Sequence, residues 1–195
     1  PRHHLTANAF AVAQGETFNL TTIRKQLADS GYRCVGQVME HGEFATRGAI
    51  LDIYPMGSPL PYRIELFDDT VESIRSFDLE TQCSIEKIEK IQLLPAREYP
   101  LTEDAITHFR QTWRAKFSGN PQEAPLYRHI SRAEPAAGVE YYLPFFYDHT
   151  ASFMDYLPAK TQLLIIGNLP ETAHHFWDEI KHRHEQLRYD VTRPL

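Results

Sequence analysis

The sequence predicts an α+β fold for its first half, an antiparallel sheet with one helix, followed by a partial α/β domain. Three observations support this prediction. A helical pattern at 20–31 precedes a long stretch in which apolar residues alternate with a period of two. The alternation stops at Pro95 and Pro100. A pattern of helix, loop, strand and helix then follows, as in half of an α/β unit whose partners are missing.

The first half divides into one helix and five strand-like segments. The helix at 20–31 can be capped by Thr21 or Thr22 and ended by Gly31. The last strand-like segment, "SIEKIEKIQLLP", also fits a helix, but its β-branched residues and terminal proline favour a strand. The five segments are expected at 32–39, 43–55, 61–67, 70–78 and 84–95.

The second half begins with a helix that Thr102 can cap. Ile106, Phe109 and Trp113 share one face of this helix, which predicts that they are buried. The run "QLLIIG" is the longest apolar stretch and is typical of a buried strand. The remaining elements are a loop, this buried strand and a closing helix, expected at 119–138, at 162–167 and after Pro170.

The charge distribution bears on the possible partners. The 195 residues carry a net charge of −6. Residues 11–94 contain 8 Lys and Arg against 13 Asp and Glu, a balance of −5, whereas the remaining residues contain 12 and 13, a balance of −1. An acidic first half does not favour contact with a DNA backbone, which requires clustered cations. No apolar run is long enough for a membrane helix.

Several kinds of chemistry lack their sequence motif. No GxxxxGK[ST] or GxGxxG is present, so we expect no ATP bound in a phosphate loop. The ten histidines include His174, His175, His182 and His184, but no pair among these four has the i, i+4 spacing of helical metal ligands, which favours a solvated helix face. The two cysteines, Cys34 and Cys83, are expected to be reduced thiols. The absence of an initial methionine favours a piece of a longer protein.

Asp52, in "ILDIYP", leaves two interpretations open. A lone carboxylate in an apolar strand sometimes marks a catalytic site. It can equally be a structural side chain that accepts hydrogen bonds near a turn. We favour the structural role, because no second catalytic group lies at a fixed spacing from Asp52.

The segment "PYRIELFDDTVESIRSF" predicts a hairpin with an unusual outer face. Alternation gives a core face and an opposite face that carries Arg63, Glu65 and Phe67. With Asp68 and Asp69 as a two-residue loop, the expected pairs are Phe67 with Thr70, Glu65 with Glu72, and Arg63 with Ile74. The core face is expected to hold Tyr62, Ile64, Leu66 and Val71.

An exposed phenylalanine beside arginines needs an explanation. Exposure of Phe67 to solvent is unfavourable. We therefore expect another element of the chain or a partner to cover it. Arginine and aromatic residues are enriched at interface hot spots. Arg47, in the apolar segment at 43–55, needs a carboxylate partner or a route to solvent. Burial under another segment and binding of a partner both remain open from spacing alone.

The residues of this region resemble a known family. The segments "QVMEHGEFATRGAILDIYPMGSPLPYRIELFDDTVESIRSFD" and "LLPAREYP" closely resemble the bacterial transcription-repair coupling factors (Mfd). The repair protein UvrB has a related signature. The resemblance implies that residues 11–94 form a UvrA-binding domain like UvrB domain 2. It further implies that residues 1–10 end a preceding UvrB-like domain and that 95–195 form a degenerate domain 1b of helicase or RecA-like type, without ATPase motifs.

The same resemblance implies a set of site residues. The family's UvrA-contacting residues map onto Arg47, Arg63 and Phe67, with the acidic position Glu65 between the last two. The chain is therefore expected to be a non-enzymatic docking module without cofactors that recruits nucleotide excision repair to stalled transcription. The parent protein would be a cytoplasmic, ATP- and Mg²⁺-dependent DNA translocase, with RNA polymerase and double-stranded DNA as further partners and no membrane. The alternative is a UvrB-like DNA-binding fragment.

Overall fold

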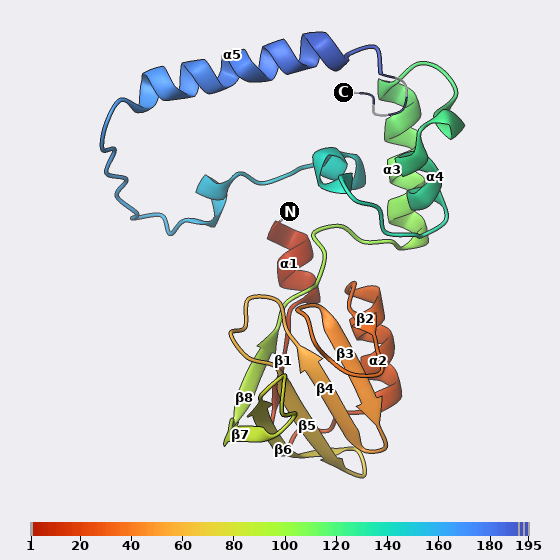
Figure 1. Cartoon of the computed structure of the whole chain (residues 1–195), viewed down its shortest axis with the longest axis vertical. Helices are drawn as coiled ribbons and strands as arrows, with labels where there is room; N and C mark the ends of the chain where they lie inside the picture. Colours follow the sequence, from red (N-terminus) through yellow and green to blue (C-terminus); the bar gives the residue numbers. More distant parts are fainter. Residues whose placement is uncertain (1, 191, 193, 195) are drawn as a thin grey trace. The chain divides into compact units, whose positions relative to one another are not determined.

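The computed structural model describes residues 2–190, 192 and 194, so Pro1, Val191, Arg193 and Leu195 lie outside the described residues. The chain divides into two compact units, Pro1–Pro100 and Leu101–Leu195 (Figure 1). Residues 95–100 therefore lie with the first unit, where the backbone N–H of Ala96 donates to the carbonyl oxygen of Ser30 at 2.9 Å.

The first unit has the α+β architecture that the sequence predicts. Its main sheet has six strands in the order β2-β3-β4-β5-β6-β7, antiparallel except for the parallel pair β2–β3. Strands β1 and β8 form a second, two-stranded antiparallel sheet. The elements are α1 (Arg2–Asn8), β1 (Phe10–Ala13), α2 (Leu20–Asp29), β2 (Arg33–Cys34), β3 (Glu43–Arg47), β4 (Ile50–Tyr54), β5 (Tyr62–Phe67), β6 (Thr70–Phe77), β7 (Ser84–Lys87) and β8 (Lys90–Leu93).

Helix α2 covers one face of the main sheet (Figure 1). Asn19 caps it, because the Asn19 side chain accepts a hydrogen bond from the N–H of Thr22, so the expected cap at Thr21 or Thr22 is wrong. Gly31 follows the helix with φ +93°, a conformation that favours glycine and that ends the helix where the sequence predicts. The core under α2 contains Val12, Phe18, Leu27, Tyr32, Phe44, Leu51, Ile53, Ile64, Leu66, Val71, Ile74, Ile91 and Leu93.

Two predicted strands differ from the structure. The expected strand at 84–95 is two strands, because the chain leaves β6 after Lys87 and joins β1 from Lys90 onward. The backbone of Ile88 and Glu89 connects the two sheets, with bonds to Ile74 and Gln14 respectively. The expected strand at 32–39 is also reduced, since only the two residues of β2 pair with β3.

The second unit is helical around an aromatic core. Thr102 caps α3 as predicted, and Ile106, Phe109 and Trp113 are buried. Their ring neighbours include Phe146, 4.9 Å from Phe109, and Tyr142, 5.1 Å from Trp113. The elements are α3 (Glu103–Lys116), η1 (Pro121–Glu123), α4 (Pro125–Ser131), η2 (Val139–Phe146), η3 (Phe153–Tyr156) and α5 (Leu169–Leu187).

The predicted buried strand at 162–167 is wrong. This segment has no regular structure, and Leu163, Leu164, Ile165 and Ile166 are exposed. A strand needs a neighbour for its backbone N–H and C=O groups, and the described part of the second unit contains no other strand. A helicase or RecA-like sheet is therefore not confirmed for 95–195. None of the helices in the described residues has the length and apolar character needed to cross a membrane.

Candidate functional site

The candidate site lies on the face of the main sheet that α2 leaves uncovered. Side chains alternate along each strand, so Leu51 and Ile53 enter the core while Asp52 points to the opposite face. We call this surface the charged face and define it by Arg47, Asp52, Arg63, Glu65 and Phe67. A small apolar cluster of Val38, Ala45, Tyr54 and Phe77 lies beside it.

Asp52 is the centre of the charged face. It lies in the middle of β4, directly opposite Arg63 on β5, and only 1% of its surface is exposed. Arg63 Nε donates to Asp52 Oδ1 at 2.7 Å, and a second nitrogen of Arg63 donates to Oδ2 at 2.9 Å. Arg47 donates to Oδ2 at 3.2 Å. Asp52 thus has the structural role that the sequence favoured, and it ties three strands together.

Arg63 is mostly buried, which corrects the expectation that it stands exposed. Its side chain is 18% exposed. Besides Asp52, it donates to the carbonyl oxygen of Gln82 at 3.1 Å and lies over the Phe77 ring at 4.9 Å. The hydrogen bonds to Asp52 raise the pKa of Arg63, so the guanidinium stays charged. Arg63 therefore mainly stabilises the sheet, and only a small part of its side chain is accessible to a partner.

Arg47 and Phe67 form the accessible part of the charged face. The Arg47 side chain is 57% exposed and Phe67 is 70% exposed. Arg47 ends β3 opposite Ile50, and Ile50 lies opposite Glu65 on β5. The N–H of Leu66 donates to the carbonyl oxygen of Ala49 at 2.9 Å, which brings the end of β5 beside the β3–β4 turn. Arg47 and Phe67 therefore lie at the same end of the sheet.

The β5–β6 hairpin has the predicted turn, but its register differs from the predicted one. Phe67 pairs with Thr70 across the two-residue turn, as predicted. A bulge then shifts the register between Glu65 and Leu66. Two predicted pairs, Glu65 with Glu72 and Arg63 with Ile74, are therefore wrong; the observed pairs are Glu65 with Ser73, and Arg63 with Arg75.

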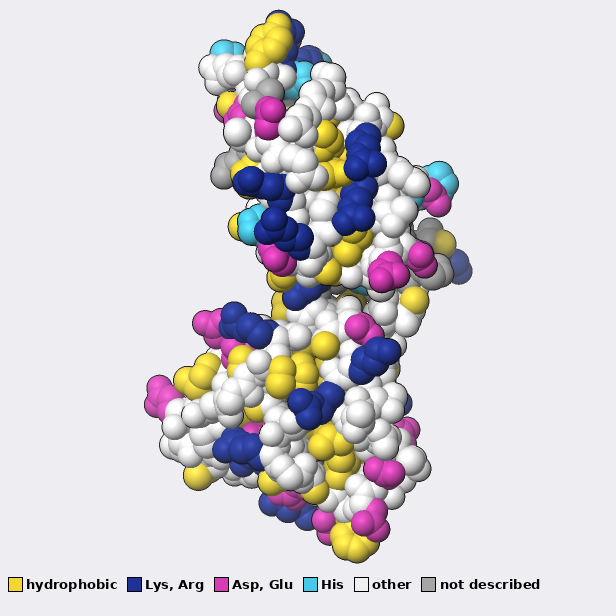
Figure 2. Space-filling view, turned by 90° about the vertical axis from the view of Figure 1, so that its right-hand side faces the viewer, with side chains coloured by type: hydrophobic (Ala, Val, Ile, Leu, Met, Phe, Trp, Pro, Cys, Tyr) yellow, Lys and Arg dark blue, Asp and Glu magenta, His cyan; other side chains and the backbone are white. Residues whose placement is uncertain are grey.

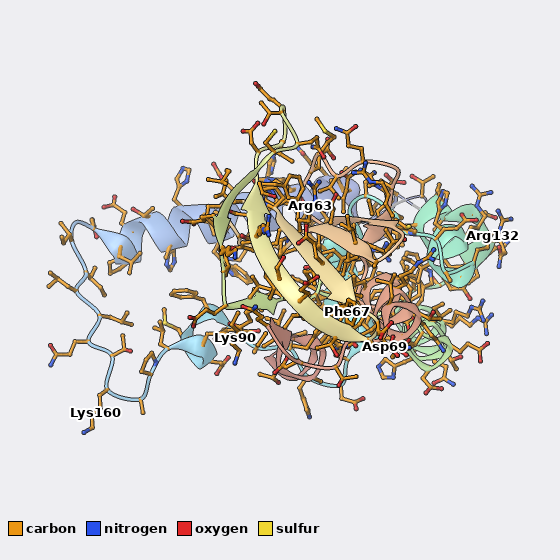
Figure 3. All side chains as sticks on the ribbon, turned by 90° about the horizontal axis from the view of Figure 1, so that it is seen from below. Arg63, Phe67, Asp69, Lys90, Arg132 and Lys160 are labelled. Atoms are coloured by element: carbon orange, nitrogen blue, oxygen red, sulfur yellow. The ribbon has the colours of Figure 1, made fainter. Side chains whose placement is uncertain are left out.

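The bulge has a clear electrostatic consequence. Two glutamates directly opposed on a sheet repel each other, and the shift gives Glu65 a hydroxyl partner instead. Ser73 Oγ donates to Glu65 at 2.5 Å, and a nitrogen of Arg75 lies 3.8 Å from the same carboxylate. Glu65 therefore has a hydroxyl donor and a nearby cation in place of a second carboxylate. Figure 3 shows Arg63 and Phe67 along β5, with Phe67 near the turn at Asp69.

A second buried carboxylate, Glu43, lies at the start of β3. It accepts backbone N–H bonds from Met39 and Glu40, at 2.8 and 2.9 Å, and a side-chain bond from Arg33 at 2.5 Å. Burial alone would raise the pKa of Glu43, but these three donors outweigh it and lower the pKa. Glu43 holds the loop at 39–43 in place and connects it to β2.

The structure therefore brings Arg47, Arg63, Glu65 and Phe67 onto one face, although not with equal exposure. Sequence reasoning missed the anchoring role of Asp52 toward both arginines and missed the contribution of Arg75. The available signal was that Asp52 is the one charged residue in the apolar run "GAILDIYP", next to an arginine that needs a carboxylate partner. Nothing among the described residues forms a cluster of three or more potential metal ligands.

Comparisons with known proteins define the class of this unit. Residues 10–99 match the UvrB interaction domain family, a span that contains the whole charged face. The complete chain is 41% identical to the transcription-repair-coupling factor of Escherichia coli and 40% identical to that of Haemophilus influenzae. A third relative, the transcription-repair-coupling factor of Bacillus subtilis, is 34% identical over 73% of the chain.

These matches identify residues 10–99 as a UvrB interaction domain. The chain as a whole belongs to the family of transcription-repair-coupling factors. It spans 17% of the length of the Escherichia coli and Haemophilus influenzae relatives, so most of those proteins has no counterpart in this chain.

Proposed function

We propose that the charged face is a docking site for UvrA and that the chain recruits nucleotide excision repair to stalled transcription. The observation that carries this proposal is an exposed aromatic, Phe67, at the same end of the main sheet as an exposed arginine, Arg47. Arginine and aromatic side chains supply most hot spots in protein interfaces. The family of the chain agrees with a role in repair.

The hydrogen bonds within the charged face favour binding, because side chains that they hold lose little conformational entropy on association. Arg63 is fixed by Asp52, Gln82 and Phe77, and Glu65 is fixed by Ser73. Side chains that are already immobile lose less entropy when a partner binds. Arg63 and Glu65 would therefore act as a pre-formed floor, while Arg47 and Phe67 would make the direct contacts.

The proposal assigns no catalysis and no cofactor to this chain. In a full-length protein, ATP and Mg²⁺ would bind outside these residues, and those other parts would contact RNA polymerase and the double-stranded DNA along which the protein moves. A cytoplasmic location fits such a role. The DNA-binding alternative is not favoured for residues 11–94, because their balance of −5 opposes a phosphate backbone.

Titration of the labelled chain with purified UvrA tests the proposal. Phe67→Ala and Arg47→Ala are each expected to weaken binding about 30-fold, which corresponds to about 2 kcal/mol for a buried hot spot. Added salt should weaken the Arg47 contact more than the Phe67 contact.

The second unit offers a matched control for Phe67. Phe153 is 72% exposed, so Phe153→Ala removes the same side chain at the same exposure from a different surface. This variant should bind UvrA normally, as should Arg24→Ala on α2. Unchanged binding by both Phe67→Ala and Arg47→Ala, with intact folding, would refute the docking site.

A further inference from the structure

A cleft of about 310 Å³ lies between α3 and α4 in the second unit. It is lined from α3 by Thr107, Arg110, Gln111 and Arg114, and from the other side by Gln122, Tyr127 and Ser131. No carboxylate lines this cleft. Two arginines surrounded by neutral donors, without an acidic neighbour, are the composition that proteins use to bind phosphate oxygens.

The two arginines are presented on one face of α3. Residues four apart on a helix lie on the same side, about 6 Å apart along its axis, so Arg110 and Arg114 point the same way. Arg110 is held in place by Ser131, because Nε donates to Ser131 Oγ at 3.2 Å and a second nitrogen donates to the Ser131 carbonyl oxygen. Arg114 is exposed, and within the described part of the chain it has no ion pair.

Further cations surround the cleft. Residues 105–132 contain five Lys and Arg and a single acidic residue, Glu123. The nearby Glu134 contacts His129 at 2.8 Å. Figure 2 shows Lys and Arg side chains gathered over the α3–α4 face of the second unit, and Arg132 is labelled at the end of α4 in Figure 3. The cations beyond the two cleft arginines are Lys116, Arg128 and Arg132.

Helix electrostatics explain only part of this arrangement. Cations in the last turn of a helix complement the partial negative charge of its C-terminus, which accounts for Arg114 and Lys116 on α3 and for Arg128 on α4. Arg110 lies before that last turn, and the complementarity does not require a cleft without carboxylates. Helix electrostatics therefore account for Arg114 but not for Arg110, nor for a cleft in which two arginines lie without a carboxylate.

We propose that the α3–α4 cleft binds phosphate groups of a nucleic-acid backbone without reading its sequence. The guanidinium fork of Arg114 fits two phosphate oxygens, and Arg110 adds a fixed positive charge and the N–H groups that do not donate to Ser131. The additional cations on both helices extend beyond one phosphate, so a polymer with regularly spaced anionic groups engages more of them than a single free phosphate. The site belongs to the second unit and is independent of UvrA docking by the charged face.

Fluorescence anisotropy of the full chain with a labelled DNA duplex of about 20 base pairs tests the site. The affinity should fall with added salt, and each lost phosphate contact should reduce the magnitude of the log–log slope by about 1. We expect Arg114→Gln to weaken binding about three- to tenfold and Arg114→Glu to weaken it further. Because Arg114 is exposed, Arg114→Gln should lower the melting temperature only slightly. Arg114→Glu places a negative charge in the last turn of α3 and should cost up to about 1 kcal/mol more, so its binding is measured well below its melting temperature.

The control keeps the change in net charge but moves it to another surface. Arg24→Gln alters an exposed arginine of the first unit that does not line the cleft, and it should leave DNA affinity within about twofold because it removes no cleft contact. Equal losses for Arg24→Gln and Arg114→Gln would overturn the assigned site. So would the absence of DNA binding at low salt, or full competition by inorganic phosphate at the same phosphate concentration, which would show a site for free phosphate.

Discussion

Asp52 shows how a single residue can organise a surface that it does not itself expose. A carboxylate with 1% exposure is costly unless it is paired and hydrogen-bonded. Arg63 meets this requirement from inside the sheet and Arg47 meets it from the rim. The two arginines proposed for docking are therefore not equivalent, since one supports the fold and the other extends from it.

This difference predicts unequal effects on stability. Arg63→Ala leaves Asp52 with only the more exposed arginine, so we expect a loss of about 2–3 kcal/mol, somewhat below the usual cost of breaking a buried pair. Arg47→Ala should cost less than about 1 kcal/mol, as for other exposed pairs. Urea unfolding of the two variants measures the difference.

The double variant Arg63→Gln with Asp52→Asn provides the control, because it removes both charges together. It should recover part of the stability that Arg63→Ala loses. If Arg47→Ala and Arg63→Ala destabilise the chain equally, Asp52 does not depend on the buried arginine as we infer.

At the residue scale, the sequence predicts which side chains share a face better than it predicts their exposure. Parity placed Arg63, Glu65 and Phe67 together, and the structure agrees for all three. It could not show that Arg63 would be covered by Phe77 and Gln82, because those contacts come from later residues whose path is set by tertiary packing. The residue opposite Glu65 could not be predicted either, because the alternation of apolar and polar residues does not reveal a bulge.

At the scale of elements, strands whose two neighbours are near in sequence were predicted well. Strands β4, β5 and β6 belong to consecutive hairpins, and each lies within its expected segment. Strands β7 and β8 were merged, since β8 pairs with the distant β1 and not with β7. The segment at 162–167 failed for the opposite reason, because its apolar pattern implies a neighbouring strand that the described residues do not provide.

Glu43 connects β2, β3 and the loop at 39–43. Its carboxylate predicts that the free energy of unfolding depends on pH in the acid range. The donors around Glu43 lower its pKa in the folded chain below the ordinary value of about 4.3. A lowered pKa gives stability that is present above the ordinary value and is lost as pH falls through the folded value. Glu43→Gln should therefore reduce stability at neutral pH and reduce it less as the pH falls below about 4.

Urea unfolding at a series of pH values from neutral to acidic measures this effect as the difference between the original chain and Glu43→Gln. The variant Glu86→Gln, at an exposed position on β7, serves as the control for the loss of one carboxylate. A deficit of Glu43→Gln that stays constant across the whole series would contradict the role assigned to the carboxylate charge.

At the scale of the whole molecule, the two units differ in how completely they bury their apolar residues. The first unit closes its core between α2 and the main sheet. In the second, α5 has no buried residue, and large apolar side chains such as Phe176 and Trp177 are exposed. Composition predicted an ordinary globular chain for both halves, because the count of apolar residues does not reveal whether their partners lie within the same chain.

The division at Pro100 makes a final prediction about which piece folds alone. Residues 1–100 contain the complete main sheet, the β1–β8 pair and α2, so the isolated piece should unfold cooperatively in a thermal melt. A shorter piece, residues 1–94, follows the boundary expected from the sequence and lacks three contacts. It loses the bond from Ala96 to Ser30, the bond between His4 and the Arg97 carbonyl oxygen, and the buried ring of Tyr99. Burial of a large apolar side chain contributes about 1.5–3 kcal/mol.

We therefore expect residues 1–94 to melt about 10 °C below residues 1–100, since 1 kcal/mol shifts the midpoint of a domain of this size by about 4–8 °C. Tyr99→Ala in the longer piece separates the ring from the backbone contact and should account for most of the difference. Both pieces keep the charged face, so both should retain UvrA binding below their melting temperatures. Equal melting of the two pieces would show that 95–100 pack on the first unit without stabilising it.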